Sequence, residues 1–173
     1  MAALPIVSAN IRVRVPEHLV VGEDSIIDDF CYISTRLTVG RGTHIASGCS
    51  IAGGAKFHCR IGDFCSLSSG VKVWCASNDF VNDLIAIVPE GIETSAAEGD
   101  VEIGSYSGVG ANSVILPDNR LPEGTAIGAL SLVPAGFKFE PWMVYAGIPI
   151  RPIRKRNRER VMAQVRQLTA PAG

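Results

Sequence analysis

Aliphatic residues recur at every sixth position along most of the chain. Unbroken runs of this pattern cover residues 21–51, 61–73 and 103–145. Four residues after many of the aliphatic positions stands a small residue, for example Ser25, Thr43, Cys49 or Ser113. Residues two apart in a short strand point to the same side, so we expect both sets to face inward. Such a period indicates a repeat fold. It predicts an all-β, parallel β-helix in which three flat sides of six residues make one coil.

Two segments depart from this pattern, and together with the repeat they form one predicted domain, residues 1–173. The β-helix is expected at residues 19–150, with a loop inserted at about 75–100, and a C-terminal α-helix at residues 151–168. Pro152 suits the first turn of that helix, and apolar residues follow at helical spacing. The loop contains the apolar stretch 84–88, for which we expect a partner surface on a neighbouring subunit.

Composition narrows the range of partners and locations. The chain has 16 Lys and Arg against 17 Asp and Glu, a net charge of -1, so no overall field favours nucleic acid or an anionic membrane. It has no long apolar run for membrane insertion and no N-terminal apolar signal stretch, and we expect a cytoplasmic protein. The five cysteines form no CxxC pair. We predict that they are small buried side chains rather than metal ligands.

Three segments carry a resemblance to a known family. They read IGDFCSLSSGVKVW, VEIGSYSGVGANSVILP and PWMVYAGIPIRPIRKR, and cover residues 61–74, 101–117 and 141–156. They resemble the hexapeptide-repeat acyltransferases, and most of all the sugar O- and N-acetyltransferases of the galactoside acetyltransferase type. The resemblance implies a left-handed β-helix, a homotrimer with active sites between subunits, and acetyl-CoA as cosubstrate without a metal.

Acyl transfer from a thioester uses a group that accepts the nucleophile's proton, and histidine is suited to this near neutral pH. His44 stands five residues after an inward valine, so it points outward and is the predicted catalytic base. Stacking of the coils places Ile26 and Arg60 beside it. Asp28, predicted to contact the acceptor, lies in the adjacent outward column, where it could orient the ring.

The inserted loop is a second candidate region for the acceptor. Galactoside-type relatives carry their base in this loop, whereas residues 76–80 here contain no histidine. Asn78 and Asp79 are predicted to bind the acceptor. The base is therefore open between His44, His58, Asp79 and no side chain at all.

The donor site is predicted at the end of the repeat. Small residues along the outer edge of the later coils allow backbone amides to meet a pantetheine arm, and basic residues beyond the last coil can meet phosphates. By resemblance, Ala111 and Ala129 are assigned to the arm, and Arg151, Arg154 and Lys155 to the phosphate end of the cosubstrate.

The resulting prediction is an acetyl-CoA-dependent acetyltransferase that modifies a sugar. We expect the acceptor to be an amino group of a nucleotide-linked amino deoxysugar in surface-polysaccharide biosynthesis, with O-acetylation of a sugar as the alternative. A non-catalytic β-helix scaffold is an alternative of another class. A carbonic anhydrase on the same repeat would need three histidines around one zinc ion, and only His44 and His58 lie in the coils.

Overall fold

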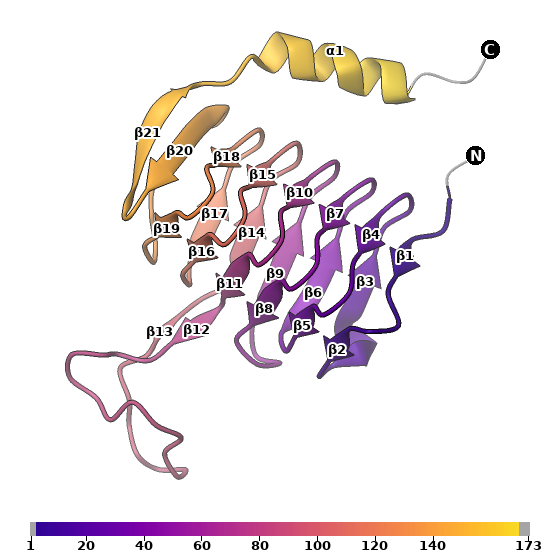
Figure 1. The fold of residues 1–173 in the computed structure, drawn as a ribbon. Helices are drawn as coiled ribbons and strands as arrows, with labels where there is room; N and C mark the ends of the chain where they lie inside the picture. Colours follow the sequence, from indigo (N-terminus) through magenta and orange to yellow (C-terminus); the bar gives the residue numbers. More distant parts are fainter. Residues whose placement is uncertain (1–2, 170–173) are drawn as a thin grey trace.

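Three parallel sheets wind into a triangular solenoid in the computed structural model, which describes residues 3–169 (Figure 1). Each coil gives one short strand to each sheet. Sheet A contains eight strands: β1 (Ile6–Val7), β4 (Ile26–Ile27), β7 (His44–Ile45), β10 (Ser66–Leu67), β15 (Gly108–Val109), β18 (Ala126–Ile127), β20 (Met143–Gly147) and β21 (Ile150–Lys155).

The other two sheets are shorter, and their strands stack in parallel register. Sheet B contains six strands: β2 (Arg12–Val13), β5 (Tyr32–Ile33), β8 (Ser50–Ala52), β11 (Lys72–Trp74), β16 (Val114–Ile115) and β19 (Leu132–Val133). Sheet C contains five: β3 (Leu19–Val21), β6 (Arg36–Val39), β9 (His58–Ile61), β14 (Val101–Ile103) and β17 (Asn119–Leu121). A 3-10 helix, η1 (Pro16–His18), leads into β3.

The inward side chains of successive coils form continuous apolar columns. On sheet A the column contains Ile27, Ile45, Leu67, Val109, Ile127 and Tyr145, which pair in register and are all at most 4% exposed. Burying one such side chain stabilises the fold by about 1.5–3 kcal/mol. The predicted all-β repeat fold is confirmed, and its six-residue period corresponds to one side of the triangle.

The small residues between the aliphatic positions fill the corners of the triangle, as predicted. The hydroxyl of Ser25 donates to the carbonyl of Gly40 at 2.7 Å, and that of Thr43 to the carbonyl of Gly62 at 2.8 Å. All five cysteines are free and buried, which confirms their predicted place in the core. Burial raises the pKa of the Cys65 and Cys75 thiols to about 11, so both remain protonated near neutral pH.

The C–A edge, where the chain passes from sheet C to sheet A, carries a stack of aromatic rings. The centroids of Phe64 and Tyr106 are 6.1 Å apart, and those of Tyr106 and Trp142 are 6.3 Å apart. Trp142 lies over Gly124, where an added Cβ would come within 2.4 Å of the indole and the backbone has a positive φ of 73°. Glycine is therefore required beneath the indole.

The predicted C-terminal helix begins later than expected. Residues Ile150–Lys155 form the strand β21, which pairs antiparallel with β20, and the helix α1 spans Arg158–Thr169. The assignment of residues 151–157 to the helix was wrong because the turn at residues 147–150 reverses the chain and buries Ile150 (3% exposed). The following residues then pair with the free edge of the last parallel strand.

The first coil also begins before residue 19, since β1 and β2 already pair with the second coil. The inserted loop lies close to its predicted bounds. Its base is an antiparallel ribbon of β12 (Ala76–Ser77) and β13 (Ala97–Glu98), which leaves the solenoid after β11. Residues 78–96 contain no helix or strand and project from the body of the molecule (Figure 1).

Candidate active site

The outer face of sheet A holds the predicted base. His44, on β7, pairs in register with Ile26 and Ser66, and its side chain is 46% exposed. Its Nε2 lies 2.8 Å from the Oδ2 of Asp28, which follows β4. The predicted proximity of Asp28 and His44 is therefore present.

The prediction that Arg60 lies beside His44 was wrong. Arg60 pairs with Thr38 and lies on sheet C. The chain forms an additional turn over residues 53–57, in which Gly53 and Gly54 have φ of 157° and 83°. The turn lengthens the segment between the inward positions Ile51 and Ile61 beyond the usual six residues. β9 therefore lies on sheet C, one side earlier than the count of six-residue units indicates.

The contact with Asp28 determines which ring nitrogen of His44 is available. When Nε2 carries the hydrogen and donates it to the carboxylate, Nδ1 keeps its lone pair and can accept a proton. The pair can therefore act as an oriented general base.

A strip of small side chains extends from His44 along the outer face of sheet A. Successive coils place Ser66, Gly108 and Ala126 in register with His44. The parallel column contains Ser68, Gly110 and Gly128, whose amides donate to carbonyls of the following coil. No bulky side chain stands on these positions, so an elongated ligand can lie flat against the sheet.

The A–B edge, where the chain passes from sheet A to sheet B, borders this strip and contains Ala111 and Ala129. The carbonyl of Ala111 accepts the amide of Leu130 at 2.9 Å, and that of Ser69 accepts the amide of Asn112 at 3.1 Å. The same stacking continues to Ser47, whose hydroxyl is 3.5 Å from that of Ser69. Neither serine was among the site residues predicted from the sequence. The sequence did contain a signal for them, because each serine stands two residues after an inward aliphatic residue, as Ala111 and Ala129 do.

The basic residues of β21 lie at the far end of sheet A from His44. Arg154 and Lys155 line a hollow of about 480 Å³ between the hairpin and α1, together with Arg160. Arg151 pairs with Ala146 nearer the turn of the hairpin. Four strands separate β7 from β21, so a ligand that contacts both must span about 24 Å at the usual strand spacing.

Trp142 and Arg156 connect this hollow to the solenoid. Arg156 donates to the carbonyls of Tyr106 (2.6 Å) and Gly124 (2.7 Å), and its guanidinium lies 5.7 Å from the Trp142 ring. The indole N–H of Trp142 donates to Glu123 at 3.2 Å. The indole thus contacts Gly124, Tyr106 and Arg156, and Trp142 anchors the hairpin to the solenoid.

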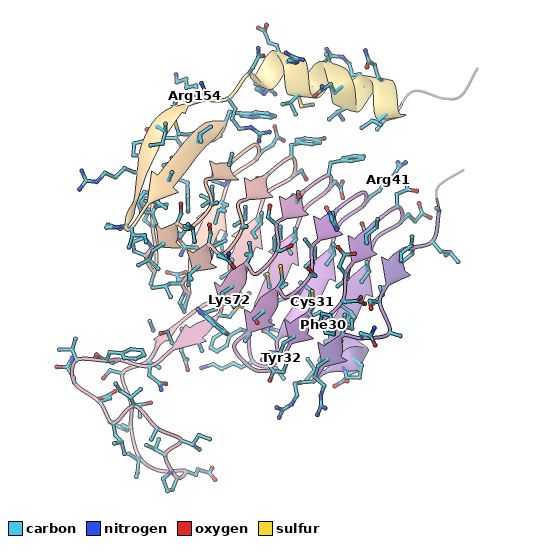
Figure 2. All side chains as sticks on the ribbon, in the orientation of Figure 1. Phe30, Cys31, Tyr32, Arg41, Lys72 and Arg154 are labelled. Atoms are coloured by element: carbon cyan, nitrogen blue, oxygen red, sulfur yellow. The ribbon has the colours of Figure 1, made fainter. Side chains whose placement is uncertain are left out.

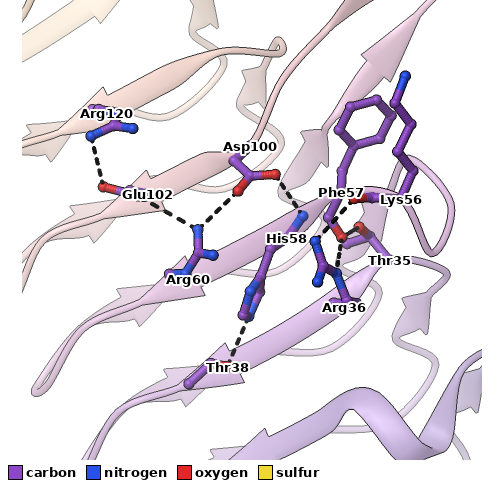
Figure 3. A network of polar contacts seen from close by, with 10 residues as sticks. All are labelled: Thr35, Arg36, Thr38, Lys56, Phe57, His58, Arg60, Asp100, Glu102 and Arg120. Atoms are coloured by element: carbon purple, nitrogen blue, oxygen red, sulfur yellow. Dashed lines mark hydrogen bonds and ion pairs between the residues drawn. The ribbon is translucent and has the colours of Figure 1, made fainter.

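His58 lies on sheet C, apart from His44. Its Nε2 is 2.9 Å from the Thr38 hydroxyl, and its backbone N–H donates to Asp100 at 2.9 Å (Figure 3). Partial burial and the charges of Arg60 and Arg36 lower the pKa of His58. The ring is a weaker base than an ordinary histidine, and Nε2 already has a partner.

The outward charges around His58 form a continuous network of ion pairs across sheet C (Figure 3). Arg60 lies 2.9 Å from Asp100 and 3.5 Å from Glu102, and Glu102 lies 3.7 Å from Arg120. Each of these cations has a carboxylate partner. The network is therefore locally neutralised and offers little net charge to a ligand.

Within a single chain, the loop residues predicted to bind the acceptor lie on a different part of the fold from His44. Asp79 accepts the side-chain amide of Asn82 at 2.7 Å and the backbone N–H of Val81 at 2.8 Å. These bonds, the first of them most strongly, lower the pKa of Asp79, which makes it a poor proton acceptor. Asn78 directly follows β12 in the ribbon that leaves the solenoid after β11 of sheet B, whereas His44 lies on sheet A.

Comparisons with known proteins identify relatives that are similar in sequence or in fold. A dTDP-4-amino-4,6-dideoxy-D-glucose acyltransferase from Escherichia coli is 33% identical over 148 residues, which cover 83% of this chain and 74% of the relative. The structure is similar to that of AntD, an N-acyltransferase from Bacillus cereus in complex with dTDP and 3-hydroxybutyryl-CoA. The TM-score is 0.86 at 29% identity, with 96% of this chain and 90% of AntD covered.

A more distant structure, a maltose O-acetyltransferase from Clostridium difficile 630, shares the fold with a TM-score of 0.63 at 21% identity, covering 80% of this chain and 70% of that one. No protein-family model matches the chain. The coiled fold, the oriented histidine and these relatives together define an acyltransferase built on a β-solenoid. The chain belongs to the hexapeptide-repeat acyltransferase family.

Proposed function

We propose that the protein transfers the acyl group of an acyl-CoA to the amino group of a nucleotide-linked 4-amino-4,6-dideoxysugar. The observation that carries this proposal is the pair of His44 and Asp28, 2.8 Å apart, at one end of the strip of small residues on sheet A. The relative from Escherichia coli is named for an acyl transfer to the dTDP-linked form of such a sugar. AntD holds dTDP and an acyl-CoA.

The oriented ring of His44 supplies the proton transfer. The neutral amine of the sugar attacks the thioester carbon, and Nδ1 of His44 accepts the proton that the nitrogen loses as the N–C bond forms. The C–S bond then breaks, and the imidazolium returns the proton to the departing thiolate sulfur. Asp28 holds the ring in the required tautomer throughout. Ser69 lies on the adjacent edge and can donate its hydroxyl to the carbonyl oxygen as negative charge develops.

The donor lies along sheet A in this proposal. Its pantetheine arm runs over the small residues of β10, β15 and β18 beside Ala111 and Ala129. Its phosphates meet Arg154 and Lys155 in the hollow beside α1, with Arg151 nearer the hairpin turn. An extended coenzyme A matches the separation of about 24 Å between β7 and β21. Acetyl is the acyl group that the sequence predicts, and AntD shows that a larger group is compatible with this fold.

We further propose that the active form is a homotrimer with sites between subunits. Apolar side chains of the loop are exposed in the single chain, including Val81 (88%), Leu84 (71%) and Ile87 (102%). The A–B edge exposes Phe30 and Leu130 as well. Exposed apolar surfaces of this extent are typical of contacts between proteins. A neighbouring loop could then bring Asn78 and Asp79 to the acceptor.

A role in surface-polysaccharide biosynthesis in the cytoplasm is part of the proposal. The five free, buried cysteines are consistent with a reducing compartment. No helix in residues 3–169 combines the length and the apolar character that crossing a bilayer requires.

The test is a transfer assay with the purified protein. The protein is incubated with dTDP-4-amino-4,6-dideoxyglucose and either acetyl-CoA or 3-hydroxybutyryl-CoA, and mass spectrometry follows the gain of one acyl group while a thiol reagent follows release of coenzyme A. We expect an amide product. In a parallel incubation with a nucleotide sugar that has no amino group, formation of a sugar ester would instead support O-acylation. No stabilisation against heat by acetyl-CoA would support a non-catalytic scaffold.

A further inference from the structure

The outer face of sheet B carries positive charges that have no carboxylate partner. Its outward side chains on the first four coils are Arg12, Arg14, Tyr32, Ser34, Ser50, Ala52, Lys72 and Trp74. These positions contain three cations and no carboxylate. Within residues 3–169, none of the three cations forms an ion pair. In a chain with a net charge of -1, an unpaired basic face is suited to an anion.

The cations of this face are held in place by neutral groups. Arg14 donates to the phenolic oxygen of Tyr32 at 3.4 Å. Lys72 donates to the carbonyls of Gly48 (3.1 Å) and Gly70 (2.9 Å), which uses two of its three N–H groups. Both side chains therefore have donors left for a ligand. Figure 2 labels Tyr32 and Lys72, which come from β5 and β11.

Two aromatic side chains flank a shallow floor on the same face. Tyr32 pairs in register with Ser50, and Ser50 with Lys72. Trp74 pairs with Ala52. The coil between the two aromatic residues thus carries only small side chains, and the strands of Tyr32 and Trp74 are about 9.6 Å apart at two strand spacings. A flat ring in contact with side chains on both sides needs a gap of about 7 Å, which is less than this separation of the two strands.

We infer that this surface, the sheet B slot, binds the nucleoside diphosphate of the acceptor substrate, with the base between Tyr32 and Trp74 and the phosphates at Arg14 and Lys72. Aromatic rings bind the faces of bases, and cations bind phosphates. The inference rests on the proposed function. Coenzyme A also contains a nucleoside diphosphate, but the basic hairpin that suits it lies at the other end of the solenoid.

The test compares binding of dTDP and of coenzyme A by calorimetry in the full-length protein. Arg14→Gln should raise the Kd for dTDP about tenfold, the usual scale for a charge-assisted hydrogen bond, and leave the Kd for coenzyme A unchanged. Tyr32→Leu should weaken dTDP binding but not that of inorganic pyrophosphate. Added salt should weaken dTDP binding by the wild type more than by Arg14→Gln.

Arg120→Gln is the matched control, because Arg120 is paired with Glu102 on sheet C. It should change neither dissociation constant, and melting temperatures should show that all variants fold. The slot is refuted if Arg14→Gln and Arg12→Gln both bind dTDP as the wild type does, or if they weaken only coenzyme A. If the wild type acylates the nucleotide sugar and these variants keep its KM, the slot alone fails. If the wild type neither binds dTDP nor acylates the sugar, the proposed function fails too.

Discussion

The outer faces of sheets A and C differ strongly although the two sheets share one core. Their inward columns contain the same kinds of aliphatic side chains at the same period. Outward, sheet A presents His44 and a strip of small residues, whereas sheet C presents Arg60, Glu102 and Arg120 in a neutralised network. The inward positions therefore determine the coil, and the outward positions are free to determine the chemistry. Four experiments test this separation.

The largest effect is expected at His44. The His44→Ala variant should lose about 10²–10⁴-fold in kcat/KM, the usual contribution of a general base. Because the side chain is outward and half exposed, the fold should remain intact. Turnover is measured against pH in the transfer assay, with circular dichroism as the folding check.

His58→Gln, on sheet C, is the matched control. Glutamine can keep a hydrogen bond to Thr38, and we expect turnover near that of the wild type. If His44→Ala retained near-normal turnover across the pH range while His58→Gln did not, the assignment of the base would be reversed.

The second effect concerns the strip of small residues. Gly108→Leu should raise the KM for acyl-CoA tenfold or more, on the order of 1.4 kcal/mol or above, because the side chain would stand where the pantetheine arm lies. Gly108→Ala is the control. A Cβ at this position meets nothing closer than 4.0 Å, so the smaller variant should fold and bind almost normally. An unchanged KM in Gly108→Leu would place the donor elsewhere.

The third effect is a change of charge at the far end of sheet A. Arg154→Glu should raise the KM for acyl-CoA by about tenfold and leave kcat nearly unchanged, because it removes a phosphate contact of the ground state and the transition state alike. Steady-state kinetics check this. Arg120→Glu on sheet C reverses the same charge outside the donor path. An equal rise of KM in both variants would indicate a general electrostatic effect.

The smallest effect is expected in the sheet C network. Partial burial acts to raise the pKa of Asp100, but hydrogen bonds from the His58 amide and from Arg60 outweigh it and lower this pKa overall. A carboxyl whose pKa is lowered by folding stabilises the folded protein at pH values above its unfolded-state pKa of about 4. This stabilisation is lost as the pH falls through the folded-state pKa. Asp100→Asn should therefore lower the melting temperature near pH 7, with a difference that persists down to about pH 4 and shrinks as the pH falls further.

Because Asp100 is 37% exposed, the loss should not exceed about 1 kcal/mol. Asp79→Asn provides the comparison. Asp79 also has a lowered pKa, but it bonds only within the projecting loop, so its replacement should leave the melting temperature unchanged. A larger loss for Asp79→Asn than for Asp100→Asn would contradict this view of the loop.

The solenoid and part of the site could be predicted because the sequence repeat corresponds directly to the geometry of the coil. One six-residue unit equals one side of the coil, so the register alone placed Asp28 beside His44. The same counting failed at Arg60, since the glycine-containing turn at residues 53–57 adds length without disturbing the core. Pattern counting detects inward positions well and extra turn residues poorly.

The C-terminal strand could not be predicted for a different reason. Residues 151–155 have no strong alternation, and their extended form depends on the free edge of β20. That edge exists only when the whole solenoid has formed. Similarly, Ser47 and Ser69 gain significance only through the stacked edge they share with Ala111, which no local motif shows and which appears only when the positions of successive coils are aligned.

The antiparallel strand β21 also has a consequence for solubility. A stack of parallel strands has no intrinsic end, and an open last strand would be a template for further chains and for fibre growth. In sheet A, β21 occupies that edge and makes a poor template itself, because Pro152 has no N–H to offer and because Arg151, Arg154 and Lys155 repel a second copy. The same hairpin that we assign to the cosubstrate therefore opposes end-to-end growth at this edge of the solenoid.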